Sequence, residues 1–193
     1  MAAAIDTIAE LGYGQASLAR IAEAADTSKG VIIYHFGGKD ELIKELVADL
    51  VARAGTYMRP RIEAEQTGAG MLRALIESNL AFMAENRNHV VATVEIALNA
   101  RAADGSRLYD SAYHEMSVAA VRELLAHFQG TGEFLDTFDP LVMAGAVRAA
   151  IDGVASLLAR DPGFDAGHHA RELANLFVRA ASPPAARPQS LEE

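Results

Sequence analysis

The sequence predicts an all-α protein of about nine helices, with a helix-turn-helix domain over 1–46, a helical ligand-binding and dimerisation domain over 47–181 and a disordered tail over 182–193. Three observations support this. Half of the chain is hydrophobic (51%) with few aromatic residues (6%), apolar residues recur at helical spacing, and alternating β-branched runs are rare. The chain has no cysteine, which excludes disulfides and thiolate metal sites.

The first predicted helix covers 3–11 and ends at Gly12. Its apolar residues Ile5, Ile8 and Leu11 recur at three-residue spacing, which indicates one buried face. We interpret this segment as an ordinary core helix.

The second and third helices form a tight pair over 17–36. Leu18, Ile21 and Ala22 give the second helix an apolar face with small residues, against which another helix can cross closely. Asp26 follows, and aspartate is one of the few residues that tolerate a left-handed backbone. Ser28 can then cap the third helix, which is predicted over 28–35.

The third helix suits contact with DNA. Ser28, Lys29 and Gly30 stand at its N-terminus, where free backbone N–H groups and the positive end of the helix dipole favour phosphate. The side chains that follow can enter a major groove. This pattern predicts a helix-turn-helix DNA-binding element.

The surrounding motifs sharpen this prediction. With Gly12-Tyr13 upstream, SKG and YHF in the third helix and KDEL after it, residues 4–46 resemble the DNA-binding segment of the TetR family of bacterial transcription regulators. The resemblance implies a role for each matching position. Phosphate contacts would come from Ser17, Tyr34 and Lys39, and the groove-facing positions would be Lys29, Gly30, Val31, Ile33 and His35.

Several features depart from the family pattern. Asp26-Thr27 replaces the usual Gly-Val of the turn, Ile33 stands where an aromatic or polar residue is common, and no basic arm precedes the first helix. The net charge of −9 also argues for modest non-specific DNA binding. An alternative therefore stays open, a helical small-molecule-binding or interaction protein with degenerate DNA binding. An upstream extension rich in arginine and lysine would favour the regulator.

A long fourth helix is predicted from Lys39 to about Met58, between Gly37-Gly38 and a break at Pro60. Leu42, Leu46 and Leu50 lie on its core side. The resemblance implies that this helix links the DNA-binding segment to the rest of the chain and that its tilt sets the position of the third helix.

Two helices, predicted over 71–86 and 89–103, interrupt their apolar stripes with Asn79 and Glu95. A third, predicted over 106–129, carries Tyr109, Tyr113 and Met116 along one line, which is either core or the wall of a pocket. A buried polar group is retained with a partner, a water or a ligand, so Asn79 and Glu95 are either paired within the protein, exposed to solvent at a frayed edge, or directed at a ligand. The resemblance places the ligand pocket among the fourth to seventh helices. Our predicted pocket residues are Met71, Leu75, Asn79, Phe82, Met83, Glu95, Leu98, Tyr109, Tyr113 and Met116. The expected effector is largely apolar, with a cationic or hydrogen-bonding group facing Glu95.

The last two helices are predicted over 141–158, behind an Asp139-Pro140 start, and over 165–181. They resemble the pair that forms a four-helix bundle with a symmetry mate in the family. The predicted dimer interface contains Val142, Gly145, Ala149, Gly153, Leu173, Leu176 and Phe177. A two-fold dimer would place its recognition helices about 34 Å apart and imply a palindromic operator. A monomer could bury the same faces against its own body.

The sequence gives no sign of an enzyme, a cofactor or a metal site. His168, His169 and Glu172 lie close together on one helix, but no further metal ligand from another segment is evident. We therefore interpret them as a solvated or interfacial face. There is no signal peptide and no long uncharged apolar run, so we expect a cytoplasmic protein without a membrane partner. The leading hypothesis is a ligand-responsive regulator, most simply a repressor, whose partners are a double-stranded DNA operator, a small-molecule effector and a second copy of the chain.

Overall fold

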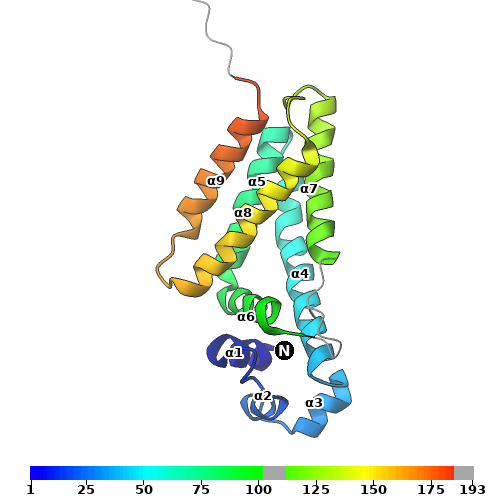
Figure 1. The fold of residues 1–193 in the computed structure, drawn as a ribbon, viewed down its shortest axis with the longest axis vertical. Helices are drawn as coiled ribbons and strands as arrows, with labels where there is room; N and C mark the ends of the chain where they lie inside the picture. The colour runs from blue at the N-terminus through cyan, green and yellow to red at the C-terminus, as the bar shows by residue number, and fades with distance from the viewer. Residues whose placement is uncertain (102–111, 185–193) are drawn as a thin grey trace, which may run out of the picture.

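The computed structural model of the chain describes residues 1–101 and 112–184, with the backbone alone at 112 and 113. Nine helices run through these residues, as the sequence predicts. Figure 1 shows α1, α2 and α3 gathered at one end, with α4 rising from them beside the other helices. The helices are α1 (Ala2–Leu11), α2 (Leu18–Ala24), α3 (Lys29–Phe36), α4 (Lys39–Glu63), α5 (Gly68–Glu85), α6 (Arg87–Asn99), α7 (Ala112–Gly130), α8 (Pro140–Arg160) and α9 (Ala166–Ala181).

Polar caps set several helix starts. Ser17, Ser28, Asp139 and Asp165 each accept a hydrogen bond from a backbone N–H in the first turn of the helix that follows. The predicted left-handed residue between α2 and α3 is confirmed, because Asp26 has a φ of 49°. These local signals explain why the helix starts lie close to the predicted positions.

The predicted break at Pro60 is wrong, because α4 continues through this residue to Glu63. Proline lacks an N–H and normally ends a helix in its interior. Here it stands in the last turn, and its own carbonyl still accepts a hydrogen bond from the Ala64 N–H at 3.2 Å. The guanidinium of Arg61 also lies 3.7 Å from the centre of the Tyr57 ring, one turn earlier. The helix therefore tolerates one missing hydrogen bond near its end.

Two hydrophobic clusters organise the fold. The first, which we call the head cluster, joins buried residues of α1, α2, α3 and the start of α4. It also includes Ala92, Ile96 and Ala100, at four-residue spacing on and just after α6. Although we predicted a domain boundary at residue 46, the core of the head is thus completed by a helix that lies far along the chain.

The second cluster, the body cluster, is formed mainly by α5, α7, α8 and α9, with Met58 and Ile62 of α4 packed against it. Within it α5 packs against α9 and α4, and α7 packs against α8. In Figure 1, α6 lies between this body and the head. The predicted tail starts directly after α9, and its residues from 185 lie outside the described part of the chain.

Gly68 stands at a close contact between α5 and a buried aromatic pair of the body. A Cβ atom added there would lie 2.5 Å from Cγ of Phe128, and the Gly68 N–H donates to Glu133 Oε2 at 2.8 Å. Phe128 is itself buried against Phe134, with 5.8 Å between the ring centroids. Only glycine lets the start of α5 approach this aromatic pair so closely.

We predict that Gly68→Ala lowers the free energy of unfolding by about 1–3 kcal/mol, because the new methyl group must displace the Phe128 ring. Gly55→Ala, in the interior of α4 with open space around it, is the matched control. It should leave stability unchanged or raise it by up to about 1 kcal/mol. Urea denaturation of both variants measures the difference, and equal midpoints would contradict this account of the packing.

Candidate nucleic-acid interface and ligand cavities

The N-termini of α2 and α3 are shaped by two serines. Ser17 Oγ accepts from the Arg20 N–H at 3.3 Å, and Ser28 Oγ accepts from the Val31 N–H at 3.2 Å. Each hydroxyl satisfies one donor of the first turn and leaves other backbone N–H groups directed along the helix axis. Both serines are exposed, so both helix ends are accessible to phosphate.

The predicted DNA-contacting residues of α3 are exposed to solvent. Tyr34 is 85% exposed, and the ring of His35 packs against its edge with 5.3 Å between the centroids. Ile32, on the opposite side, is buried in the head cluster. The predicted residues that are exposed are Ser17, Ser28, Lys29, Gly30, Val31, Ile33, Tyr34 and His35. A surface tyrosine and two exposed aliphatic residues on one short helix are typical of a contact surface.

Lys39, the ninth predicted residue, is oriented differently. Its Nζ donates to the backbone carbonyl of Tyr13 at 2.7 Å and lies 4.0 Å from the centre of the Tyr13 ring. Burial lowers the pKa of the Lys39 ammonium, while Asp40 acts in the opposite direction. The ammonium therefore ties α4 to the connection between α1 and α2, and a phosphate would have to share it with Tyr13.

Glu95 contacts the same connection from α6. Its Oε2 accepts from the Tyr13 N–H at 3.3 Å and from Asn99 Nδ2 at 3.1 Å. Gly12, whose φ is 77°, approaches so closely that an added Cβ would lie 3.2 Å from this oxygen. The expectation that Glu95 faces a ligand is corrected here, because its carboxylate is directed at the head and lines neither of the cavities that contain Asn79.

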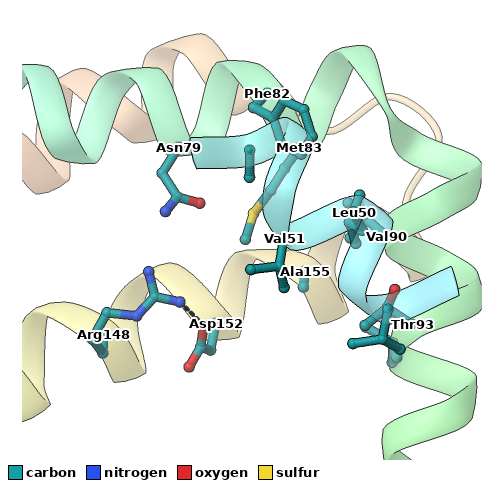
Figure 2. A pocket seen from close by; sticks show the side chains of 13 residues that line it. Leu50, Val51, Asn79, Phe82, Met83, Val90, Thr93, Arg148, Asp152 and Ala155 are labelled. Atoms are coloured by element: carbon teal, nitrogen blue, oxygen red, sulfur yellow. Dashed lines mark hydrogen bonds and ion pairs between the residues drawn. The ribbon is translucent and has the colours of Figure 1, made fainter. Parts of the chain in front are cut away.

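Two cavities are lined by α4 together with helices that pack beside it. The first has a volume of about 190 Å³ and lies between α4, α5, α6 and α8 (Figure 2). Its lining residues are Val47, Leu50, Val51, Ala54, Asn79, Phe82, Met83, Val90, Thr93, Val94, Arg148, Asp152 and Ala155. The walls are thus largely apolar, with a small polar group at one side, which is the usual composition of a small-molecule site.

The second cavity, of about 470 Å³, lies farther along α4 between α5 and α7. It shares Val51, Ala54, Asn79 and Arg148 with the first cavity, so the two meet at a common wall. Its other lining residues are Gly55, Met58, Arg59, Ile62, Glu63, Leu75, Met116, Ser117, Ala120 and Val121.

The predicted pocket residues divide between these cavities and other places. Phe82 and Met83 line the first, Leu75 and Met116 line the second, and Asn79 lines both. Among the remaining predicted residues, Met71 packs against the body cluster and Leu98 is 59% exposed and lines neither cavity. Tyr109 lies outside the described residues, and so does the side chain of Tyr113 on α7.

Arg148 is the residue of this site that sequence analysis missed. It is only 5% exposed, and its Nη2 donates to Asp152 Oδ1 at 2.6 Å. The other carboxylate oxygen of Asp152 lies 3.4 Å from His114 Nδ1 on α7. The available signal was an arginine and an aspartate four residues apart in an otherwise apolar, small-sided helix, which we had considered only for dimerisation.

The outer surfaces of α8 and α9 expose large apolar side chains. Val142 is 69% exposed and Leu176 is 60% exposed, beside Leu141 on α8. The other predicted interface residues on these helices are exposed (Ala149 and Gly153) or half-buried (Gly145, Leu173 and Phe177). Contiguous exposed apolar patches on soluble proteins are often interaction sites.

In the described part of the chain, α8 is also the one helix long and apolar enough to cross a membrane, with a mean hydropathy of 1.7. Core helices of soluble proteins can be equally long and apolar. α8 packs against α7 and α6 and carries the Arg148–Asp152 pair, and a third of its apolar stretch is buried.

Comparisons with known proteins match both parts of the chain. Residues 1–46 match the family described as bacterial regulatory proteins, tetR family, and residues 68–182 match the family of BetI-type transcriptional repressors, C-terminal. Two similar proteins are the BetI 1 regulator of Chromohalobacter salexigens and the BetI regulator of Brucella suis. The first is 33% identical over 40% of this chain and 39% of that protein, and the second is 26% identical over 81% of this chain and 83% of that protein.

Solved structures share the fold. A tetR-family regulatory protein from Rhodococcus RHA1 superposes with a TM-score of 0.77 at 18% identity, covering 94% of each chain. The regulator FadR from Bacillus subtilis, solved in complex with stearoyl-CoA, gives a TM-score of 0.77 at 20% identity, covering 93% of this chain and 96% of that one. At such identities the likeness concerns the arrangement of helices.

The Glu95 contact gives a local prediction. Glu95→Ala should speed amide hydrogen exchange at Tyr13 about fivefold, because it removes an acceptor worth about 1 kcal/mol. Leu98→Ala, an exposed change on the same helix, is the control and should leave that exchange rate unchanged. The measurement is residue-resolved exchange by NMR, and unaltered protection of Tyr13 in Glu95→Ala would show that the contact does not stabilise the head.

Proposed function

The chain belongs to the TetR family of bacterial regulatory proteins, and on that basis we propose that it is a dimeric repressor released from a palindromic operator by a small molecule. The observation that carries this proposal is the double role of α6. One side of this helix completes the head cluster through Ala92 and Ile96, and another side lines the first cavity through Val90, Thr93 and Val94. A ligand in that cavity would therefore touch the helix that supports the DNA-binding head.

The DNA-binding step is supported by the surface of α3. Lys29, at the capped N-terminus, supplies the positive charge, and the side chains of Val31, Tyr34 and His35 are exposed beside it. In the proposed complex, the helix N-terminus and Tyr34 contact phosphate, while Lys29, Val31 and His35 face the groove. In this proposal the partner is a double-stranded DNA operator, and the protein acts in the cytoplasm, where bacterial DNA lies.

The release step is supported by contacts of α4 and α6 with the Tyr13 segment of the head. Lys39 on α4 and Glu95 on α6 both bind the backbone of Tyr13, from different sides. Because α4 and α6 also form walls of the first cavity, a ligand that changes their separation would change the orientation of the head. Two heads reoriented in this way would no longer match successive turns of DNA.

The dimer is supported by the exposed apolar surface of α8 and α9. In our proposal this surface meets its symmetry copy, which buries Val142 and Leu176 in a four-helix contact. The same helix α8 carries the buried Arg148 on its inner side, so the interface and the cavity share one helix.

The acidic character of the head favours a second candidate, a ligand-binding protein with degenerate DNA binding. Over residues 1–45 the basic side chains Arg20, Lys29, Lys39 and Lys44 are outnumbered by acidic ones. Lys39 is also engaged by Tyr13. Selection of an operator from random duplex DNA separates the two candidates.

We predict that the purified chain selects a palindromic sequence from random duplex DNA and that Lys29→Ala weakens this binding about tenfold and reduces the salt dependence by about one charge. Tyr34→Ala should also weaken binding. The measurement is fluorescence anisotropy with the selected duplex at two salt concentrations.

Lys44→Ala is the matched control for this prediction. Lys44 has the same charge, but it lies on α4 and its Nζ pairs with Glu41 Oε1 at 2.7 Å. Its removal should change affinity much less than the removal of Lys29. If no sequence is enriched, with either this chain or an extended one, the second candidate replaces the repressor.

We predict that Val142→Glu converts the dimer to a monomer, because an unpaired carboxylate in an apolar interface costs several kcal/mol. Leu98→Glu changes another exposed aliphatic side chain, which lies outside α8 and α9, and should leave the dimer intact. Light scattering coupled to gel filtration measures the molar mass. A wild-type monomer, or a Val142→Glu dimer, would contradict the proposed interface.

A further inference from the structure

The guanidinium of Arg148 is a buried charge at the wall that the two cavities share. Its Nη2 is bound to Asp152, but its Nε is buried and has no hydrogen-bond partner. A buried donor without a partner destabilises a folded protein, and the cost is larger for a charged group. A second partner for Arg148 would offset this cost.

Asp152 satisfies Arg148 only in part. Its side chain is 44% exposed and its second oxygen lies near His114, so the carboxylate stands at the edge of the cavity and is shared with α7. Figure 2 shows Arg148 reaching from α8 toward Asn79 on α5, with Asp152 to one side. A ligand between Arg148 and Asn79 could therefore bind both the guanidinium and the amide group.

Apolar side chains continue from this polar group. Leu50 and Val51 of α4, Phe82 and Met83 of α5 and Val90 of α6 line the first cavity. The second cavity adds space of the size that small-molecule sites usually have. A ligand that fits both regions has a polar end at Arg148 and an apolar remainder.

The charges select the sign of that polar end. Arginine binds carboxylates through paired hydrogen bonds in a planar fork and repels cations. The acidic residues that line the two cavities are Asp152, which is already paired with Arg148, and Glu63, which accompanies Arg59 in the second cavity. Asp152 is therefore not free to balance a cationic ligand beside Arg148, and the charge of Glu63 is offset by that of Arg59, which lines the same cavity.

We propose that the effector is an amphipathic carboxylate, whose anionic end binds Arg148 and Asn79 and whose apolar part lies between α4, α5 and α6. This inference rests on the proposed function, because it names the ligand class of the same cavity. It replaces the expectation, based on Glu95, of a cationic group.

The test compares probes that share one alkyl chain and differ in the end group: decanoate, decanol, decyltrimethylammonium and decanoyl-coenzyme A. Calorimetric titration of the full chain without DNA, below the micellar concentration of each probe, measures binding directly. Decanoate should bind about tenfold more tightly than decanol, because the carboxylate gains charge-assisted hydrogen bonds. Decanoyl-coenzyme A distinguishes a free acid from a thioester, and it should bind more weakly than decanoate.

Two substitutions assign the effect to Arg148. Arg148→Gln should remove the preference for decanoate over decanol, while Arg148→Lys should retain part of it. Asp152→Asn removes the carboxylate that competes for Arg148, so it should tighten decanoate binding severalfold. A purely structural ion pair would not produce such a gain, and circular dichroism melts confirm that each variant is folded.

Three results would overturn the inference: tighter binding of decyltrimethylammonium or of decanoyl-coenzyme A than of decanoate, equal decanoate binding in folded Arg148→Gln and wild type, or no binding of decanoate. Operator release is measured separately. Decanoate that binds through Arg148 without releasing DNA would refute the ligand response while leaving the assigned ligand class intact. Release by a chemically different molecule, without decanoate binding, would do the reverse.

Discussion

The packing of α6 into the head is the constraint on which the rest of the structure depends. Ala92, Ile96 and Ala100 are fully buried there together with residues of α1 to α4, so the three-helix head does not close its core without this helix. Small side chains at two of these positions let α6 approach α1 closely. Because cores are close-packed, a shift of α6 is transmitted to the head as a displacement. The body thus positions the DNA-binding surface.

The polar contacts around Tyr13 add direction to this packing. Lys39 holds the Tyr13 carbonyl from α4, and Glu95 holds the Tyr13 N–H from α6. One peptide segment is therefore bound by the two helices that also face the first cavity. Hydrophobic contact alone would allow α6 to slide along α1, whereas directional hydrogen bonds fix the relative orientation. Lys39 and the half-buried Glu95 therefore both have a structural role in the head.

Local signals made much of the fold predictable from sequence. The serine caps, the aspartate with positive φ and the helical spacing of apolar residues depend on neighbours within one or two turns, and the structure follows them. The residues that line the cavity were predicted only in part, because the direction in which a side chain points depends on helices that are distant in sequence. Glu95 and Leu98 share α6 with cavity residues, yet a helix exposes several faces, and spacing alone does not tell which face meets the head. Arg148 was missed because its burial follows from the packing of α8.

The burial of Arg148 also bears on how ligand and head communicate. The guanidinium of Arg148 is held by the carboxylate of Asp152 on the same helix, and its Nε has no partner among the described residues. A carboxylate between Arg148 and Asn79 would bridge α8 and α5, while its apolar part would contact α4 and α6. The polar end would then fix the ligand in the body and the apolar end would act on the helices that support the head. A ligand bound at only one end would fill space without coupling the two regions, which is why an amphipathic molecule suits this site better than a purely polar or a purely apolar one.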